Sequence, residues 1–193
     1  MWDKTVEGIG LMMRVDNLES IPEVNLPERY GWRLYQPGDE EAWAEMWTSA
    51  EGFSSRERAL ASFQREFPAG QPMDKRMIFL TDNGVPFATA TAWYGKDGPD
   101  GEEGRLHWVC VDEAHQGQKL SGALIALSMK LTRELGHKNA ILYTQTPCWV
   151  AIRMYNKFGF RPVVNNEKEM RGWQIVTEKS GVDFMKMIEE DKK

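Results

Sequence analysis

Cysteine, positive charge and long apolar runs are all scarce in this chain of 193 residues. Its two cysteines, Cys110 and Cys148, are too few for a disulfide scaffold in a chain of this size, so reduced thiols are expected. No stretch approaches the roughly 18 apolar residues of a membrane span, and the start MWDKTVEGIG lacks the basic-then-apolar order of a secretory signal. We therefore expect a cytoplasmic protein without a membrane partner.

The low positive charge argues against a further class of partner. The chain has 24 Lys and Arg against 29 Asp and Glu, a formal net charge of -5, and its basic residues are scattered. Binding to a phosphate backbone requires a basic patch, so nucleic acid is not expected as a partner. His107 and Cys110 make half of a metal-ligand set, but no second pair completes a tetrahedral site, so no metal is expected.

The remaining composition is that of an ordinary globular protein, with 41% hydrophobic and 27% charged residues. The length favours a single domain with an appendage. Pro22 and Pro27 bracket a segment with neither helical nor strand period. Residues 1–31 are therefore predicted to be an N-terminal arm packed on a domain of residues 32–178, with residues 179–193 as a C-terminal tail.

The apolar periodicity of residues 32–178 predicts an α/β (α+β) fold. Strands are expected at residues 32–35, 76–81, 85–94, 106–111, 139–146, 160–163 and near 170–177. Helices are expected after the N-cap Asp39, from the capping box of Ser54 and Glu57, along the leucine stripe of residues 120–135, and after Thr146-Pro147, where Thr146 is the N-cap. Asn83-Gly84 predicts a hairpin between the second and third strands.

The strand, turn and helix at residues 106–135 carry the strongest functional signal. A helix N-terminus after a glycine-containing turn offers unpaired N–H groups to an anion such as a pyrophosphate. The turn reads Gln116-Gly117-Gln118-Lys119-Leu120-Ser121-Gly122-Ala123. It resembles the donor-binding loop of the GNAT acetyltransferase superfamily, Arg/Gln-x-x-Gly-x-Gly/Ala.

A second motif has the family's order and spacing. Val111 stands five residues before Gln116, and residues 151–160 match the family pattern Ala-x-x-x-Tyr-x-x-x-Gly-Phe at every specified position. The resemblance covers roughly residues 32–178. It implies a mixed, mostly antiparallel central sheet flanked by helices, with the donor loop between strand 4 and the following helix, and acetyl-CoA (coenzyme A) as the donor.

Three positions depart from the family pattern. Lys119 and Ser121 stand where the loop usually has glycine or a small residue, and Cys148 replaces the asparagine that often begins the second motif. Lys119 either adds positive charge near the CoA phosphates or extends into solvent. The loop is therefore atypical in side chains, although its backbone role is retained in this interpretation.

The resemblance also implies which residues bind the donor. The backbone of residues 108–111 would pair with the pantetheine arm like an added strand, a mode that is insensitive to side-chain identity. The expected donor-binding residues are Trp108, Val109, Cys110, Val111, Gln116, Gly117, Gln118, Lys119, Leu120, Ser121, Gly122, Ala123, Cys148 and Ala151.

Acetyl transfer to an amine requires a base for the ammonium and a proton for the departing thiolate. His107 is the candidate base, because it resembles one of two strand histidines used as bases in the arylalkylamine N-acetyltransferases, and Arg105 stands at the second position. Glu102, Glu103 and Asp112 are alternative bases. The alternative to a catalytic role is that His107 is a core histidine bonded to a backbone carbonyl.

Tyr155 is the candidate acid, because the resemblance places its phenol by the thioester sulfur, with core packing as the alternative. An acyl-enzyme on cysteine is disfavoured, since no histidine-based activation of either thiol is visible in the sequence. The sequence therefore predicts direct attack of the acceptor on acetyl-CoA.

Aromatic side chains are the candidates for the acceptor pocket, because their faces hold aliphatic or cationic amines. These candidates are Trp93, Tyr94, Trp108, Trp149 and Trp173, although most of the eight tryptophans are expected to be packing residues. The sequence thus predicts an acetyl-CoA-dependent N-acetyltransferase for a small-molecule amine. The alternatives are a non-catalytic acyl-CoA-binding or sensory domain, a protein or peptide N-acetyltransferase, and a plain interaction domain. Acceptor identity cannot be read from the sequence, and a homodimer is left open.

Overall fold

The structure, a computed structural model that describes residues 2–191, consists of two compact units. The first unit comprises the residues up to Ile21, Tyr94–Arg105 and the residues from Gly136 onward, and the second unit comprises Pro22–Trp93 and Leu106–Leu135. Hydrogen bonding orders the seven strands β2-β3-β4-β5-β6-β1-β7. The sheet is mostly antiparallel and flanked by helices, which confirms the predicted fold class. Among residues 2–191, no helix is long and apolar enough to cross a membrane.

The second unit contains the strand–turn–helix segment. Its strands are β2 (Tyr30–Leu34), β3 (Met77–Asp82), β4 (Val85–Tyr94) and most of β5 (Glu103–Val111). Its helices are α1 (Asp39–Ser49), α2 (Arg56–Glu66), α3 (Met73–Arg76), the 3-10 turn η2 (Glu113–His115) and α4 (Leu120–Glu134). β3 and β4 are antiparallel, and the left-handed Asn83 and Gly84 between them confirm the hairpin.

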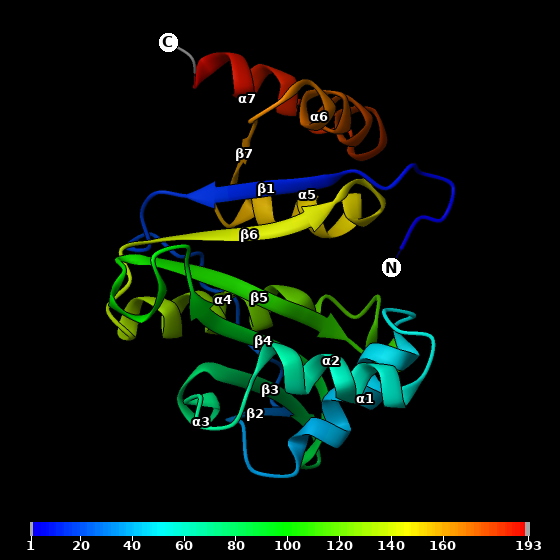
Figure 1. Ribbon diagram of the computed structural model, residues 1–193, viewed down its shortest axis with the longest axis vertical. Helices are drawn as coiled ribbons and strands as arrows, with labels where there is room; N and C mark the ends of the chain where they lie inside the picture. The colour runs from blue at the N-terminus through cyan, green and yellow to red at the C-terminus, as the bar shows by residue number, and fades with distance from the viewer. Residues whose placement is uncertain (1, 192–193) are drawn as a thin grey trace. The chain divides into compact units, whose positions relative to one another are not determined.

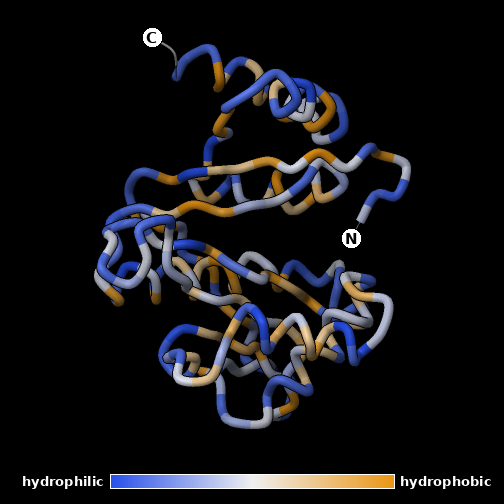
Figure 2. Tube along the Cα trace, viewed as in Figure 1, coloured by the Kyte–Doolittle hydropathy of each residue, from blue (hydrophilic) through white to orange (hydrophobic). Residues whose placement is uncertain are grey.

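The first unit is built on β1 (Gly10–Val15), which lies between β6 (Asn139–Gln145) and β7 (Arg161–Val163) and is antiparallel to both. β5 begins here, parallel to β6 through Glu103–Arg105. The helices of this unit are η1 (Gly98–Asp100), η3 (Thr146–Cys148), α5 (Trp149–Lys157), α6 (Glu167–Ser180) and α7 (Phe184–Glu190). Figure 1 shows α5 running behind β1 and β6. Figure 2 shows hydrophobic segments along parts of both strands.

The expectation that residues 1–31 lack regular structure was wrong for β1. Leu11, Met12, Met13 and Val15 are buried, so the segment has no strand-like alternation of exposed and buried residues. An interior strand covered on both faces reads as a continuous apolar run, and the turn formers around this one concealed it. The domain boundaries at residues 31 and 178 remain predictions.

The expectation of a final strand near residues 170–177 was also wrong, because this segment lies in α6. The Asn166 side chain accepts a hydrogen bond from the Glu169 backbone N–H and begins the helix, and Gly181, with φ 70°, ends it. Gly172, Trp173 and Val176 are buried at helical spacing. Helix capping therefore outweighs the β-forming residues that suggested a strand.

Three predicted helix N-caps differ in the structure. Two are shifted by one residue, and the side chain of the third makes a tertiary contact instead. Ser55, rather than Ser54, caps α2 by accepting from the Arg58 N–H. Asp39 is the first residue of α1 rather than its N-cap, and its carboxylate accepts two hydrogen bonds from Arg33, at 2.6 and 2.7 Å. The Thr146 hydroxyl accepts from the Ile9 N–H at 2.9 Å, which joins β1 to the end of β6 and does not cap α5.

Candidate donor and acceptor sites

The strand that leads into the expected donor loop is irregular at its centre. Trp108 has φ 51°, a left-handed conformation that is uncommon in a strand. Leu106 and His107, which are consecutive, are both buried, so the alternation of faces is interrupted at this point. Residues 108–111 of the predicted pantetheine-binding segment therefore follow a local bend of β5.

The turn after β5 is exposed and ends in an uncapped helix. Gly117 has φ 77° and has nothing within 4 Å of the position a Cβ would take. Lys119 stands at the N-cap of α4 with φ 63°, and no side chain caps this helix. The first-turn N–H groups thus lack a side-chain acceptor, which is the arrangement that binds anions at helix N-termini.

Lys119, one of the departures from the family pattern, has a left-handed backbone. The family usually has glycine at this position, and glycine adopts positive φ without strain. Here lysine occupies a left-handed conformation, and its cationic side chain is exposed. Ser121 is the second departure and lies half-buried in the first turn of α4.

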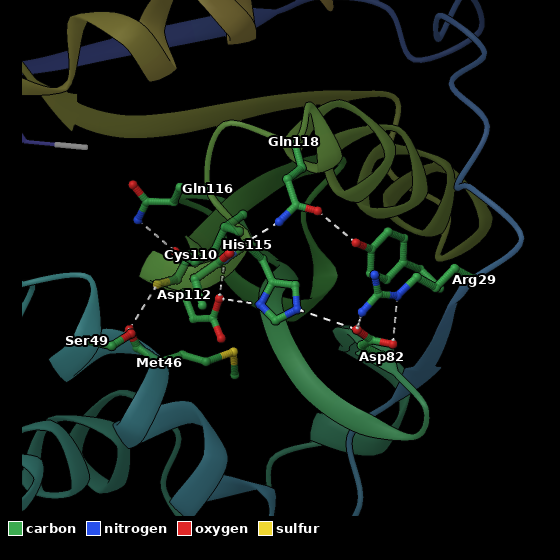
Figure 3. Close-up of polar contacts among 12 residues, drawn as sticks. Arg29, Met46, Ser49, Asp82, Cys110, Asp112, His115, Gln116 and Gln118 are labelled. Atoms are coloured by element: carbon green, nitrogen blue, oxygen red, sulfur yellow. Dashed lines mark hydrogen bonds and ion pairs between the residues drawn. The ribbon is translucent and has the colours of Figure 1, made fainter.

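A group of side chains in the second unit supports the turn from outside the motif. Tyr30 of β2 donates from its hydroxyl to Gln118 Oε1 at 2.8 Å, and Gln118 Nε2 donates to the Ala114 carbonyl at 3.2 Å. Gln116 Nε2 donates to the Val111 carbonyl at 3.0 Å. These bonds tie both glutamines of the loop to the surrounding backbone and to β2 (Figure 3).

His115 continues this support. Its Nδ1 lies 2.6 Å from Asp112 Oδ1, and its ring stacks on Phe87 with centroids 4.1 Å apart. Its Nε2 lies 3.9 Å from Asp82 Oδ2, and Asp82 in turn accepts from Arg29, which lowers the pKa of Asp82. Asp112, an alternative base in the sequence analysis, is thus engaged in holding His115 (Figure 3).

His107, the candidate base, is paired with a carboxylate. It is 9% exposed, and its Nε2 lies 3.4 Å from Oε2 of Glu66, the last residue of α2. Two of the other predicted bases, Glu102 and Glu103, lie in the first unit. Glu102 forms an exposed ion pair with Lys138, and Glu103 accepts from the Lys96 N–H at 3.3 Å. The structure therefore pairs His107 with a carboxylate from the end of α2.

Beside His107, the second unit collects an aromatic cluster. Its members come from α1, α2, the segment after α1, β4 and β5, and are Trp43, Trp47, Phe53, Phe63, Phe67, Trp93 and Trp108. Trp108 contacts three other rings of the cluster, with centroids 4.9 Å from Trp47, 5.2 Å from Trp43 and 5.9 Å from Phe53. Two predicted acceptor residues, Trp93 and Trp108, thus belong to one cluster.

The remaining acceptor candidates lie in the first unit. Trp173 is fully buried and donates from Nε1 to the Val163 carbonyl at 3.1 Å, so it has no exposed surface to offer an acceptor. Trp149 donates from Nε1 to Asp3 Oδ2 at 3.0 Å. Tyr94 lies against His137, with ring centroids 6.5 Å apart, and Arg105 lies over the Tyr143 ring at 4.8 Å.

The second motif forms α5 and the turn that follows it in the first unit. Tyr155 is 9% exposed, and its ring contacts Phe160 with centroids 6.2 Å apart. Gly159, with φ 86°, allows the sharp turn between the helix and β7. Cys148 and Ala151, the two expected donor-binding residues of this unit, are half-buried at and after the start of the helix.

Neither thiol is set up as a nucleophile. Burial raises the pKa of Cys110 to about 12, and its Sγ lies 3.6 Å from the Met46 carbonyl (Figure 3). Burial also raises the pKa of Cys148. A raised pKa leaves the thiol protonated near neutral pH, whereas the thiolate is the reactive form.

Comparison with known proteins bears on the loop, the helix after it and the second motif together. Residues 39–160 match the acetyltransferase (GNAT) family. The chain belongs to this family. The matched residues include both motifs on which the resemblance was based.

The individual proteins that resemble this chain have low sequence identity to it. A mycothiol acetyltransferase from Thermobispora bispora is 27% identical over 147 residues, which are 72% of this chain and 49% of that protein. The chain therefore spans about half the length of this curated relative. A GCN5-related N-acetyltransferase from Sphaerobacter thermophilus has a TM-score of 0.61 at 21% identity, covering 80% of this chain and 48% of that one. A GNAT acetyltransferase from Colwellia psychrerythraea has a TM-score of 0.63 at 13% identity, covering 81% and 53%. At these identities the two structures show the GNAT fold alone.

Sequence reasoning missed several residues that the structure brings to these sites. Glu66 lies 41 positions before His107, and no local pattern links the two. Trp43 and Trp47 were read only as the buried face of a helix, although their spacing placed both on one side of α1. Tyr30 and His115 carried no signal, because their contacts with the loop depend on how β2 and η2 pack.

Proposed function

We propose that this protein transfers the acetyl group of acetyl-CoA to the amine of a small molecule by direct attack. The observation that carries the proposal is the donor loop, in which left-handed Gly117 and Lys119 lead into the uncapped N-terminus of α4 inside the region that matches the GNAT family. That arrangement suits a diphosphate, the anionic group of CoA.

Each chemical role is assigned to a residue in this proposal. His107 removes the proton of the acceptor ammonium, the neutral amine attacks the thioester carbonyl, and the C–S bond breaks as the C–N bond forms. Tyr155, assigned from the second motif, protonates the departing thiolate. The raised pKa values of Cys110 and Cys148 support direct attack over an acyl-cysteine intermediate.

The relative named mycothiol acetyltransferase supports a small-molecule acceptor over a protein acceptor. The amine as the accepting group is the finer part of the proposal and rests on His107, because an alkylammonium with a pKa of about 10 must lose a proton before it attacks.

The experiment is a titration followed by a turnover assay. A ligand that binds only the folded state stabilises it by about 2.7 kcal/mol at a hundredfold excess over Kd, so acetyl-CoA should raise the melting temperature. The amine-dependent release of free CoA thiol should then follow in an amine panel. Absence of a thermal shift at millimolar acetyl-CoA would remove the proposal, and a shift without thiol release from any amine would favour a binding domain.

A further inference from the structure

The aromatic cluster has a buried base and a partly exposed rim. Trp43, Phe63 and Phe67 are buried, whereas Trp47, Phe53, Trp93 and Trp108 are only half-buried. The indole nitrogens of Trp43, Trp47 and Trp108 have no hydrogen-bond acceptor among residues 2–191, so these rings are positioned by ring packing. The rim is therefore an apolar surface that reaches solvent.

An anionic group lies beside this rim. Glu66 is followed by Phe67, whose ring lies 5.2 Å from Trp93 and 6.1 Å from His107, and the His107 ring lies 5.4 Å from Trp108. The Glu66 side chain is 31% exposed, with Oε2 toward His107 and Oε1 at 3.7 Å from Arg65 Nε. A carboxylate and an imidazole thus share an edge with two indoles.

We propose that Glu66 positions His107 and recognises the cationic form of the acceptor, whose carbon skeleton lies on Trp93 and Trp108. This inference rests on the proposed function and narrows its acceptor to primary amines that carry an aromatic or aliphatic group. The carboxylate attracts the ammonium, and indole faces hold cations and apolar groups alike.

The proton balance gives Glu66 its second role. When His107 takes the proton from the ammonium, an imidazolium forms 3.4 Å from the Glu66 carboxylate, which stabilises it. The amine nitrogen is then neutral and attacks the thioester, and it loses its second proton to solvent as the amide forms. The thiolate takes a proton from Tyr155, which regains one from solvent, and the proton on His107 leaves for solvent afterwards. Glu66 touches no bond that changes, so it acts through His107 as a positioning residue.

Glu66→Gln tests this role with a matched control. The variant keeps the shape and removes the charge, so kcat/KM for the amine should fall at least tenfold while the KM for acetyl-CoA stays the same. Removing an adjacent negative charge disfavours the imidazolium, so the acid limb of the pH profile should move to lower pH. Arg65 is the other charged side chain in contact with Glu66 and stays unchanged in both enzymes. Glu45→Gln removes a 70% exposed carboxylate of α1 and should leave both measurements unchanged.

The acceptor class is tested separately with four amines. Phenethylamine and hexylamine should exceed glucosamine and a lysine-containing peptide in kcat/KM by at least tenfold, and Trp93→Leu should raise the KM for phenethylamine. A preference for glucosamine or the peptide would overturn the acceptor class, whereas acetyl-CoA binding without turnover of any amine would favour the binding domain over the proposed function. A folded Glu66→Gln enzyme with wild-type kcat/KM and pH profile would overturn the role of Glu66. Failure to bind acetyl-CoA would instead remove the proposed function itself.

If Glu66→Gln does not fold, Glu66→Asp decides the question. It keeps the charge on a shorter side chain, so it should lose part of kcat/KM and retain the acid limb of the wild type. A displaced acid limb in this variant would count against the proposal.

Discussion

The donor loop and the aromatic cluster lie in the same unit but are held in different ways. The loop depends on backbone geometry and hydrogen bonds, with Gly117 and Lys119 at positive φ and both glutamines bonded. The cluster depends on ring packing, with three indole N–H groups that find no acceptor among residues 2–191. Backbone recognition tolerates changes of side chain, whereas a surface of rings changes with each substitution. Backbone recognition therefore suits a donor that is common to a family, and the ring surface suits an acceptor that is particular to this chain.

The largest effect is expected at the base of the cluster. Trp43 is fully buried among Phe63, Phe67 and Trp108, so Trp43→Ala should lower the free energy of unfolding by about 3–5 kcal/mol. Trp32→Ala, at a 52% exposed position of β2, should change it by less than about 0.5 kcal/mol. Urea unfolding measures both. A mild Trp43→Ala would mean that the rings can collapse into the space and are less fixed than the loop.

The next effect concerns proton delivery. Tyr155→Phe keeps the ring and its contact with Phe160, so stability and affinity for acetyl-CoA should stay close to wild type while kcat falls about tenfold or more. A thiolate is a tolerable leaving group, which favours the lower end. Tyr143→Phe, at a 50% exposed position of β6, is the control. Wild-type turnover in Tyr155→Phe would make Tyr155 a packing residue.

A smaller effect is expected for a charge introduced at Gly117, and a control variant separates the effect of the charge from that of backbone strain. Gly117→Asp places a carboxylate where a diphosphate is expected, and the dissociation constant for acetyl-CoA should rise about tenfold, or about 1.4 kcal/mol. Gly84→Asp puts the same side chain at another open glycine of positive φ, in the β3–β4 hairpin. It should lose as much stability as Gly117→Asp but keep the wild-type affinity for acetyl-CoA. Calorimetric titration distinguishes the two. Equal affinities would place the donor away from this turn.

The smallest effect is expected at Lys119. Lys119→Gly relieves a left-handed cost of about 1–2 kcal/mol and adds about 0.5–1 kcal/mol of chain entropy. The unfolding free energy should therefore rise by roughly 0.75 kcal/mol, within a range of about 0 to 1.5 kcal/mol. Glu51→Gly, at φ 58° in the same unit, should behave alike. Only Lys119→Gly should reduce the salt dependence of acetyl-CoA affinity, and an unchanged dependence would show that the lysine extends into solvent.

Local signals predicted the parts of the fold whose cause is local. The hairpin followed from Asn83-Gly84, and the turn before α4 followed from the glycine at position 117. The strand β1 was missed, because a strand buried on both faces has no alternation. The segment of α6 was assigned to a strand, and the Asn166 cap that begins this helix was missed.

The sequence by itself determined the family and predicted the donor loop, because a loop that binds through its backbone needs glycine and a helix start within a few consecutive residues. Tertiary structure alone decided which side chains meet His107. Glu66 reaches it from the end of α2, and the rings of the cluster come from positions 43 to 108. Contacts of this kind depend on the packing of α1 and α2 with β4 and β5, and packing leaves no periodic trace in the order of the residues.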